Sequence, residues 1–156
     1  DVDEIIVPRE DETWPKLMTK LESLESRAAS LAVSNAFFFD SFGDEYDDED
    51  GSKLPHTLRY LRRSSLISPA PQYSKSFVST SKALTVFNHY ALGALAGAER
   101  ARAVPQDKAL LHHYKKACRP ALVDCHQYTV GTVRDESLLR LAGSLITNVN
   151  KVLDSI

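Results

Sequence analysis

The clearest hydrophobic pattern along the chain begins at Trp14. Apolar positions recur from there at alternating spacings of three and four, which is the period of one face of an α-helix. Thr13 suits the N-cap of such a helix, and Pro15 suits its first turn. The pattern therefore predicts a long first helix that ends near Gly43. Its apolar seam consists of Trp14, Leu17, Leu21, Leu24, Ala28, Leu31, Asn35 and Phe38.

Three later segments repeat the helical period. Residues 55–64 predict a short basic helix, and a stripe of heptad spacing predicts a helix over 74–103. The same spacing continues over 105–156, where Pro120 interrupts it. A proline inside a helix removes a hydrogen bond and clashes with the preceding turn. This last segment is therefore interpreted as one kinked helix, two helices or three.

Together these stripes predict an all-α fold, a helical bundle of four to five mostly antiparallel helices. The chain has 156 residues, of which 43% are hydrophobic, so it suits a single domain over 1–156. We expect three regions outside the helices. They are an N-terminal tail over 1–12, an acidic loop over 43–52 between the first two helices, and a Pro/Ser linker over 65–73.

The charges are unevenly distributed. Residues 1–52 contain 15 of the 21 acids and 4 of the 19 bases, a net charge of −11, while residues 53–156 have a net charge of +9. Two interpretations follow. Either a basic body is neutralised by its own acidic loop and terminus, which we favour, or a basic surface meets an acidic partner.

Composition also bears on location. The acidic start lacks the basic and apolar regions of a signal peptide, and the most apolar stretch, 83–98, is too short and polar to span a bilayer. Cys118 and Cys125 lie seven residues apart on a predicted helix, which separates their Cα atoms by roughly 10 Å. At that distance they cannot form a disulfide. We therefore expect an intracellular protein, cytoplasmic or nuclear, with reduced cysteines and no membrane span.

A search for reactive chemistry predicts no catalytic residues, no metal site and no cofactor. The acidic run before Gly51 does not place a glutamate at the twelfth position of an EF-hand loop. The two cysteines, with His112, His113 and His126, lack the short spacing of zinc motifs. The chain has no nucleophile elbow and no glycine-rich phosphate loop. These observations disfavour an enzyme.

The most specific short feature is a basic segment in which arginines flank an aromatic residue. Guanidinium groups present a planar fork of donors that suits phosphate or a carboxylate surface. Ser65 and Ser68 follow this segment in contexts that resemble basic-directed and proline-directed kinase sites, so they are candidate phosphosites. The candidate partner-binding residues are Arg59, Tyr60, Arg62, Arg63, Lys115, Lys116 and Arg119.

The sequence thus favours a non-enzymatic protein–protein interaction module, an adaptor or scaffold that docks a partner helix or peptide. The alternative is a nucleic-acid or ribonucleoprotein subunit that uses the basic residues as one face. The sequence leaves open whether those residues share a face, which partner binds, and the oligomeric state.

Overall fold

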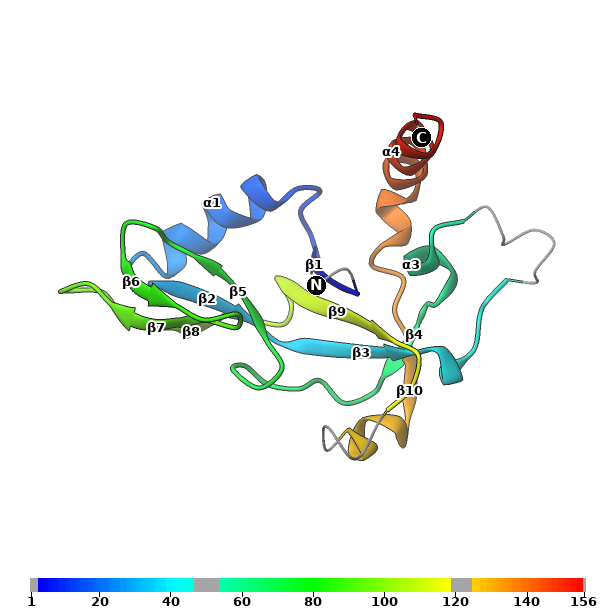
Figure 1. Ribbon diagram of the computed structural model, residues 1–156, viewed down its shortest axis with the longest axis horizontal. Helices are drawn as coiled ribbons and strands as arrows, with labels where there is room; N and C mark the ends of the chain where they lie inside the picture. The colour runs from blue at the N-terminus through cyan, green and yellow to red at the C-terminus, as the bar shows by residue number, and fades with distance from the viewer. Residues whose placement is uncertain (1–2, 47–53, 119–124, 156) are drawn as a thin grey trace. The chain divides into compact units, whose positions relative to one another are not determined.

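A computed structural model describes residues 3–46, 54–118 and 125–155 of the chain. Within these ranges the fold is mixed α/β, with ten β-strands and three α-helices (Figure 1). The predicted all-α bundle is therefore wrong. The chain forms two compact units, one from Asp1–Ala36 and Ile67–His113, the other from Phe37–Leu66 and Tyr114–Ile156.

The first strand lies in the segment that was predicted to be a tail. β1 (Glu4–Pro8) pairs antiparallel with β9 (Ala109–Lys115), with Glu4 directly opposite His113. β3 (Asn35–Phe39) lies on the other side of β9, which gives a sheet of order β1-β9-β3. The chain passes from the first unit to the second within β3, and passes from the first unit to the second again within β9. This pairing joins residues about a hundred positions apart.

A second sheet of the first unit is built around β2 (Ser30–Val33). β2 pairs antiparallel with β5 (Lys75–Val78) and parallel with β8 (Arg102–Ala103). Between β5 and β8 the chain forms a hairpin of β6 (Ala83–Val86) and β7 (Ala91–Ala94). All four residues of β2 are buried, which fits a central strand covered on both faces.

Helix α1 (Trp14–Leu24) begins where the capping signals predicted. Thr13 is its N-cap in extended conformation, and Pro15 occupies the first turn, where no intrahelical N–H partner is lost. The helix ends when the backbone N–H of Glu25 donates to the Leu21 carbonyl. Its buried face joins the hydrophobic core of the first unit. That core contains Leu17, Leu21, Ala28, Leu31, Val33, Val104, Ala109 and Leu111.

The second unit has short elements around an aromatic cluster. β4 (Arg62–Ser64) pairs antiparallel with β10 (Thr132–Arg134). The helices are α3 (His56–Arg59) and α4 (Ala142–Leu153), with short 3-10 turns at Asp40–Phe42, His126–Thr129 and Leu139–Leu141. The aromatic cluster is held by stacked or tilted ring pairs, among them Phe37 on Phe39, Phe37 on Tyr128, and Phe38 on Tyr114.

The predicted first helix is wrong beyond Leu24 because its seam continues into buried strands. β2 and β3 are buried at every position, so a continuous apolar run replaces the alternation that identifies a half-exposed strand. Such a run also contains apolar residues at spacings of three and four by chance. The segment predicted as a helix over 74–103 instead forms strands β5 to β8.

The remaining predicted helices also need correction. Residues 55–64 form one helical turn and then strand β4, and 105–131 contains β9 and a 3-10 turn. The last helix, predicted from Asp135, begins at Ala142. Pro120, the expected kink, lies outside the described residues.

The prediction that the cysteines cannot pair is wrong. Cys118 and Cys125 form a disulfide, with Cα atoms 5.7 Å apart. The expected separation assumed a continuous helix, whereas β9 ends at Lys115 and a 3-10 turn begins at His126. One premise of the expected reducing location is thereby removed, and the location itself stays a prediction. No helix in the described part of the chain has the length and apolar character that crossing a membrane requires.

Candidate functional site

A buried polar cluster surrounds His113 where β1 and β9 pair. Nδ1 of His113 lies 3.4 Å from Glu4 Oε1, and Nε2 lies 3.4 Å from Asp3 Oδ2. Lys75 of β5 adds a cation, with Nζ 3.0 Å from Glu4 Oε2. Each imidazole nitrogen therefore faces a carboxylate oxygen.

Asn35, at the start of β3, completes this cluster. Its Nδ2 lies 3.5 Å from His113 Nδ1, and its fully buried Oδ1 has no hydrogen-bond partner among the described residues. The backbone of Asn35 exchanges two hydrogen bonds with Ser68, which fixes the residue in place. A buried amide with spare acceptor capacity beside an imidazole is a polar feature that a purely structural core avoids.

The side chains of the cluster differ in their exposure to solvent. The side chain of Asp3 is 45% exposed, whereas those of Glu4 and His113 are 6% and 11% exposed. Asp3 thus forms the solvent-facing edge, and the other side chains lie behind it. The gathering of two carboxylates, an imidazole and an amine at one point of the first unit makes this cluster a candidate reactive site.

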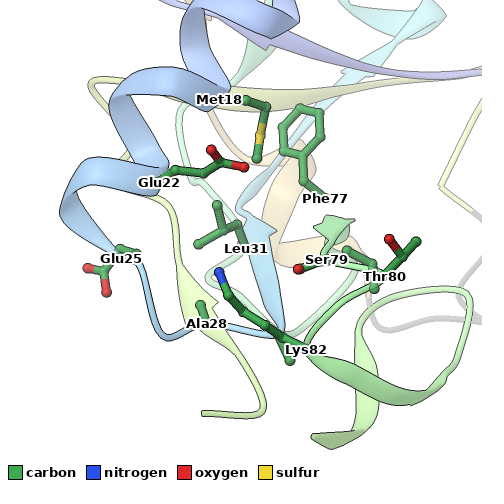
Figure 2. Close-up of a pocket in the computed structure, with 11 residues that line it drawn as sticks. Met18, Glu22, Glu25, Ala28, Leu31, Phe77, Ser79, Thr80 and Lys82 are labelled. Atoms are coloured by element: carbon green, nitrogen blue, oxygen red, sulfur yellow. The ribbon is translucent and has the colours of Figure 1, made fainter. Parts of the chain in front are cut away.

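The first unit also has a cavity of about 270 Å³ between α1, β2 and the segment that follows β5 (Figure 2). Its floor is apolar, with Met18, Leu31 and Phe77. Figure 2 shows Glu22 reaching in from α1 and Lys82 reaching in from the segment before β6. The cavity therefore combines an apolar surface with charges of both signs, as ligand pockets commonly do.

The basic residues predicted to bind a partner are paired with acids inside the second unit. Arg62 Nε lies 3.1 Å from Glu45 Oε1, and Arg63 Nε lies 2.8 Å from Asp135 Oδ2. The Arg59 guanidinium hydrogen-bonds the Asp44 carboxylate, and the Tyr60 ring stacks on His56. Arg134 also approaches Glu45, at 3.4 Å.

The acidic loop was expected to neutralise the basic residues of the chain. For the two acids of the loop that the structure describes, Asp44 and Glu45, these ion pairs confirm it. Partial burial of Asp44 raises its pKa, but the hydrogen bonds from Arg59 and from the backbone N–H of Tyr46 outweigh that effect. The charges of Arg59 and His56 act in the same direction. The pKa of Asp44 therefore lies below its ordinary value.

The other predicted site residues are dispersed. Lys115 ends β9 and is half-buried, Lys116 is exposed, and Arg119 lies outside the described residues. Of the candidate phosphosites, Ser65 is exposed, while Ser68 is fully buried and its hydroxyl donates to the Gln72 carbonyl. The predicted partner contacts of these residues remain untested. Across the described ranges, no group of three or more His, Cys, Asp and Glu side chains is arranged to hold a metal ion.

Comparison with known proteins places the chain in a family. The sequence model of glycosyltransferase family 92 matches residues 1–146, nearly the whole length. The chain belongs to glycosyltransferase family 92. No curated protein and no solved structure matches the sequence.

Membership of family 92 corrects the functional predictions. A glycosyltransferase is an enzyme, so the prediction of a non-enzymatic adaptor or scaffold is wrong, as is the statement that the chain is not an enzyme. The alternative prediction, a nucleic-acid or ribonucleoprotein subunit, is wrong for the same reason. The arginines on which the nucleic-acid alternative was based are paired with acids of their own unit.

The polar cluster of this family 92 member was missed because its residues come from four distant segments. Two local signals were nevertheless present in the sequence. Ile5, Ile6 and Val7 between Glu4 and Pro8 form a short β-branched run, which is typical of a strand. The histidines at 112 and 113 follow the apolar residues of another strand, where a buried imidazole needs polar partners.

Proposed function

We propose that the chain transfers a sugar residue from an activated donor to an acceptor, and that the cluster around His113 is its reactive site. The family match over residues 1–146 is the observation that carries the reaction class. The cluster supports the location, since it gathers buried ionisable groups behind one accessible carboxylate.

Glycosyl transfer requires a base for the acceptor hydroxyl and positive charge near the departing group of the donor. Asp3 is the accessible carboxylate and can take the proton directly, and the His113 imidazole lies behind it at 3.4 Å. Glu4 and Asn35 hold His113 from its other side and act as positioning residues. Lys75, fixed by Glu4, contributes positive charge to the same region.

The test is a transfer assay with a panel of nucleotide-activated sugars and mixed acceptors, run with Mg²⁺ or Mn²⁺ present. Asp3→Asn keeps the size of the side chain but removes the base, and we expect kcat to fall about 10²- to 10⁴-fold. Asp3 is half exposed, so the variant should fold as the wild type does.

A matched control is Asp107→Asn. Asp107 belongs to the same unit, its side chain is 68% exposed, and its carboxylate contacts Lys108 rather than the cluster. It should leave kcat unchanged. Full activity of Asp3→Asn in a folded protein would place the reactive site elsewhere.

A further inference from the structure

The cavity beside α1 contains two charged side chains of opposite sign that have no ion pair or side-chain hydrogen bond among the described residues. They are Glu22, which is exposed, and Lys82, which is half-buried (Figure 2). Glu25 at the same rim approaches Arg102 at 3.7 Å. The acid and base in this cavity are thus available to a ligand.

The apolar floor of the cavity presents a fixed aromatic ring. Phe77 lies edge-on to Trp14, with ring centroids 5.9 Å apart and an interplanar angle of 78°. The Trp14 indole is itself held by a hydrogen bond of 2.8 Å to the Ile6 carbonyl. A ring that is held this way offers a preorganised flat surface at low entropic cost. Ser79 and Thr80 line the neighbouring wall.

We infer that this cavity binds a neutral sugar ring, and, resting on the proposed function, that the ring belongs to the acceptor. A pyranose has an apolar C–H face that packs on an aromatic ring, and hydroxyl groups around its edge. The carboxylate of Glu22 accepts from such hydroxyls, and the ammonium of Lys82 donates to them. The volume of about 270 Å³ lies just below the range of drug-sized pockets, which suits a single sugar residue.

The charges of the rim distinguish an acceptor from a donor. Two carboxylates, Glu22 and Glu25, line the cavity against one ammonium, Lys82, and this excess of negative charge raises the free energy of an anion placed there. A donor activated through phosphate groups carries such an anion. The cavity therefore favours the neutral acceptor sugar over the activated end of the donor.

Binding can be measured directly because Trp14 is the one tryptophan of the chain and contacts Phe77. The 156-residue chain would be titrated with methyl glycosides of glucose, galactose and mannose while Trp14 fluorescence is recorded. We expect a saturable change with at least one glycoside. The methyl glycosides of glucuronic and galacturonic acid carry an extra carboxylate on the same rings, and we expect them to bind more weakly.

Three variants assign the binding to this cavity. Phe77→Leu removes the ring but keeps apolar bulk, and should weaken binding roughly two- to tenfold. Glu22→Gln and Lys82→Met each remove a charged hydrogen-bonding group, and should weaken it about tenfold. The control is Glu12→Gln. Glu12 lies just before the N-cap of α1, and its side chain, which is 71% exposed, pairs with Lys16 outside the cavity. It should bind as the wild type does.

Either of two results would overturn the inference: no saturable change with any glycoside up to about 100 mM, or wild-type affinity in both Phe77→Leu and Glu22→Gln.

A transfer assay separates this inference from the proposed function. Glu22→Gln should raise the acceptor KM, whereas Glu12→Gln should leave it at the wild-type value. Transfer with an unchanged acceptor KM would reject the acceptor site while the proposed function stands. Glycoside binding without any transfer would reject the proposed function while the sugar site stands.

Discussion

Arg63 Nε donates to Asp135 Oδ2 at 2.8 Å, and the Asp135 side chain is only 2% exposed. The second oxygen of Asp135 accepts from the Ser137 backbone at 3.1 Å, and the Asp135 backbone N–H donates to Leu61. The pair thereby connects β4 to the chain just after β10. A neighbouring pair, Arg134 Nε to Glu136 Oε1 at 2.9 Å, has side chains that are 49% and 59% exposed.

The first prediction compares these two ion pairs. Removing one partner of a buried pair leaves an uncompensated charge, so Asp135→Asn should lower the free energy of unfolding by about 3 kcal/mol. Glu136→Gln should lower it by less than about 1 kcal/mol, because exposed pairs are screened by water. Urea denaturation of both variants measures the difference. Equal losses would contradict the view that Asp135 stabilises the second unit through its buried contact.

The second prediction concerns alkaline pH. Burial of Tyr114, together with the charge of Asp135, raises the pKa of its phenol above the ordinary value of 10.0. Folding therefore favours the neutral phenol, which stacks on Phe38 and donates to the Thr57 carbonyl at 3.3 Å. This stabilisation is complete below pH 10 and is lost as pH rises through the raised folded pKa, because the unfolded chain ionises first.

Thermal melts between pH 8 and pH 11 would test this, with the range set by the ordinary tyrosine pKa of roughly 10. The Tm of the wild type should fall more steeply with pH than that of Tyr114→Phe, which has no phenol to ionise. Tyr46→Phe is the control, since Tyr46 is 37% exposed. Parallel curves for wild type and Tyr114→Phe would contradict the prediction.

The start of α1 was predictable from sequence because its signals are local. An N-cap, a first-turn proline and the spacing of Leu17 and Leu21 all lie within one short segment. The strands were not predictable in this way, because β1 pairs with β9 across about a hundred residues. Periodicity within a segment cannot report which distant segment covers it, and buried strands lose the alternation that would identify them.

The cluster around His113 could not be predicted from the sequence for the same physical reason. Glu4 and His113 face each other only because their strands pair, and Lys75 and Asn35 arrive from two further strands. The pairing of the acidic loop with the basic segment was predictable, since Asp44 and Arg59 lie close in sequence. Short sequence separation makes such contacts accessible to reasoning from the chain alone.

The third prediction concerns acid pH. The pKa of Asp44 is depressed, chiefly by its hydrogen bond to Arg59 against the opposing effect of burial, so folding favours its carboxylate. The stabilisation is present above the ordinary value of 3.8 and is lost as pH falls through the lower folded pKa. The difference in Tm between wild type and Asp44→Asn should therefore be constant near neutral pH and vanish in strong acid. The control is Asp154→Asn, at an exposed position just after α4, which should show no such trend. A Tm difference between wild type and Asp44→Asn that stays the same in strong acid would contradict the pairing of Asp44 with Arg59.

The last prediction concerns the disulfide. Cys118 and Cys125 close a short loop just after β9, and Cys125 is 4% exposed. Cross-linking a loop of this size reduces the entropy of the unfolded chain, which corresponds to about 2 to 3 kcal/mol of stability. A thiol reductant should therefore lower the Tm of the wild type, and a thiol-reactive probe should label two groups after reduction and none before. The variant with both Cys118→Ala and Cys125→Ala should melt at the lower temperature with or without reductant. If reduction lowers the Tm of that double variant as well, the reductant acts on something other than the disulfide. If the probe labels the untreated wild type, the disulfide does not form in the isolated protein.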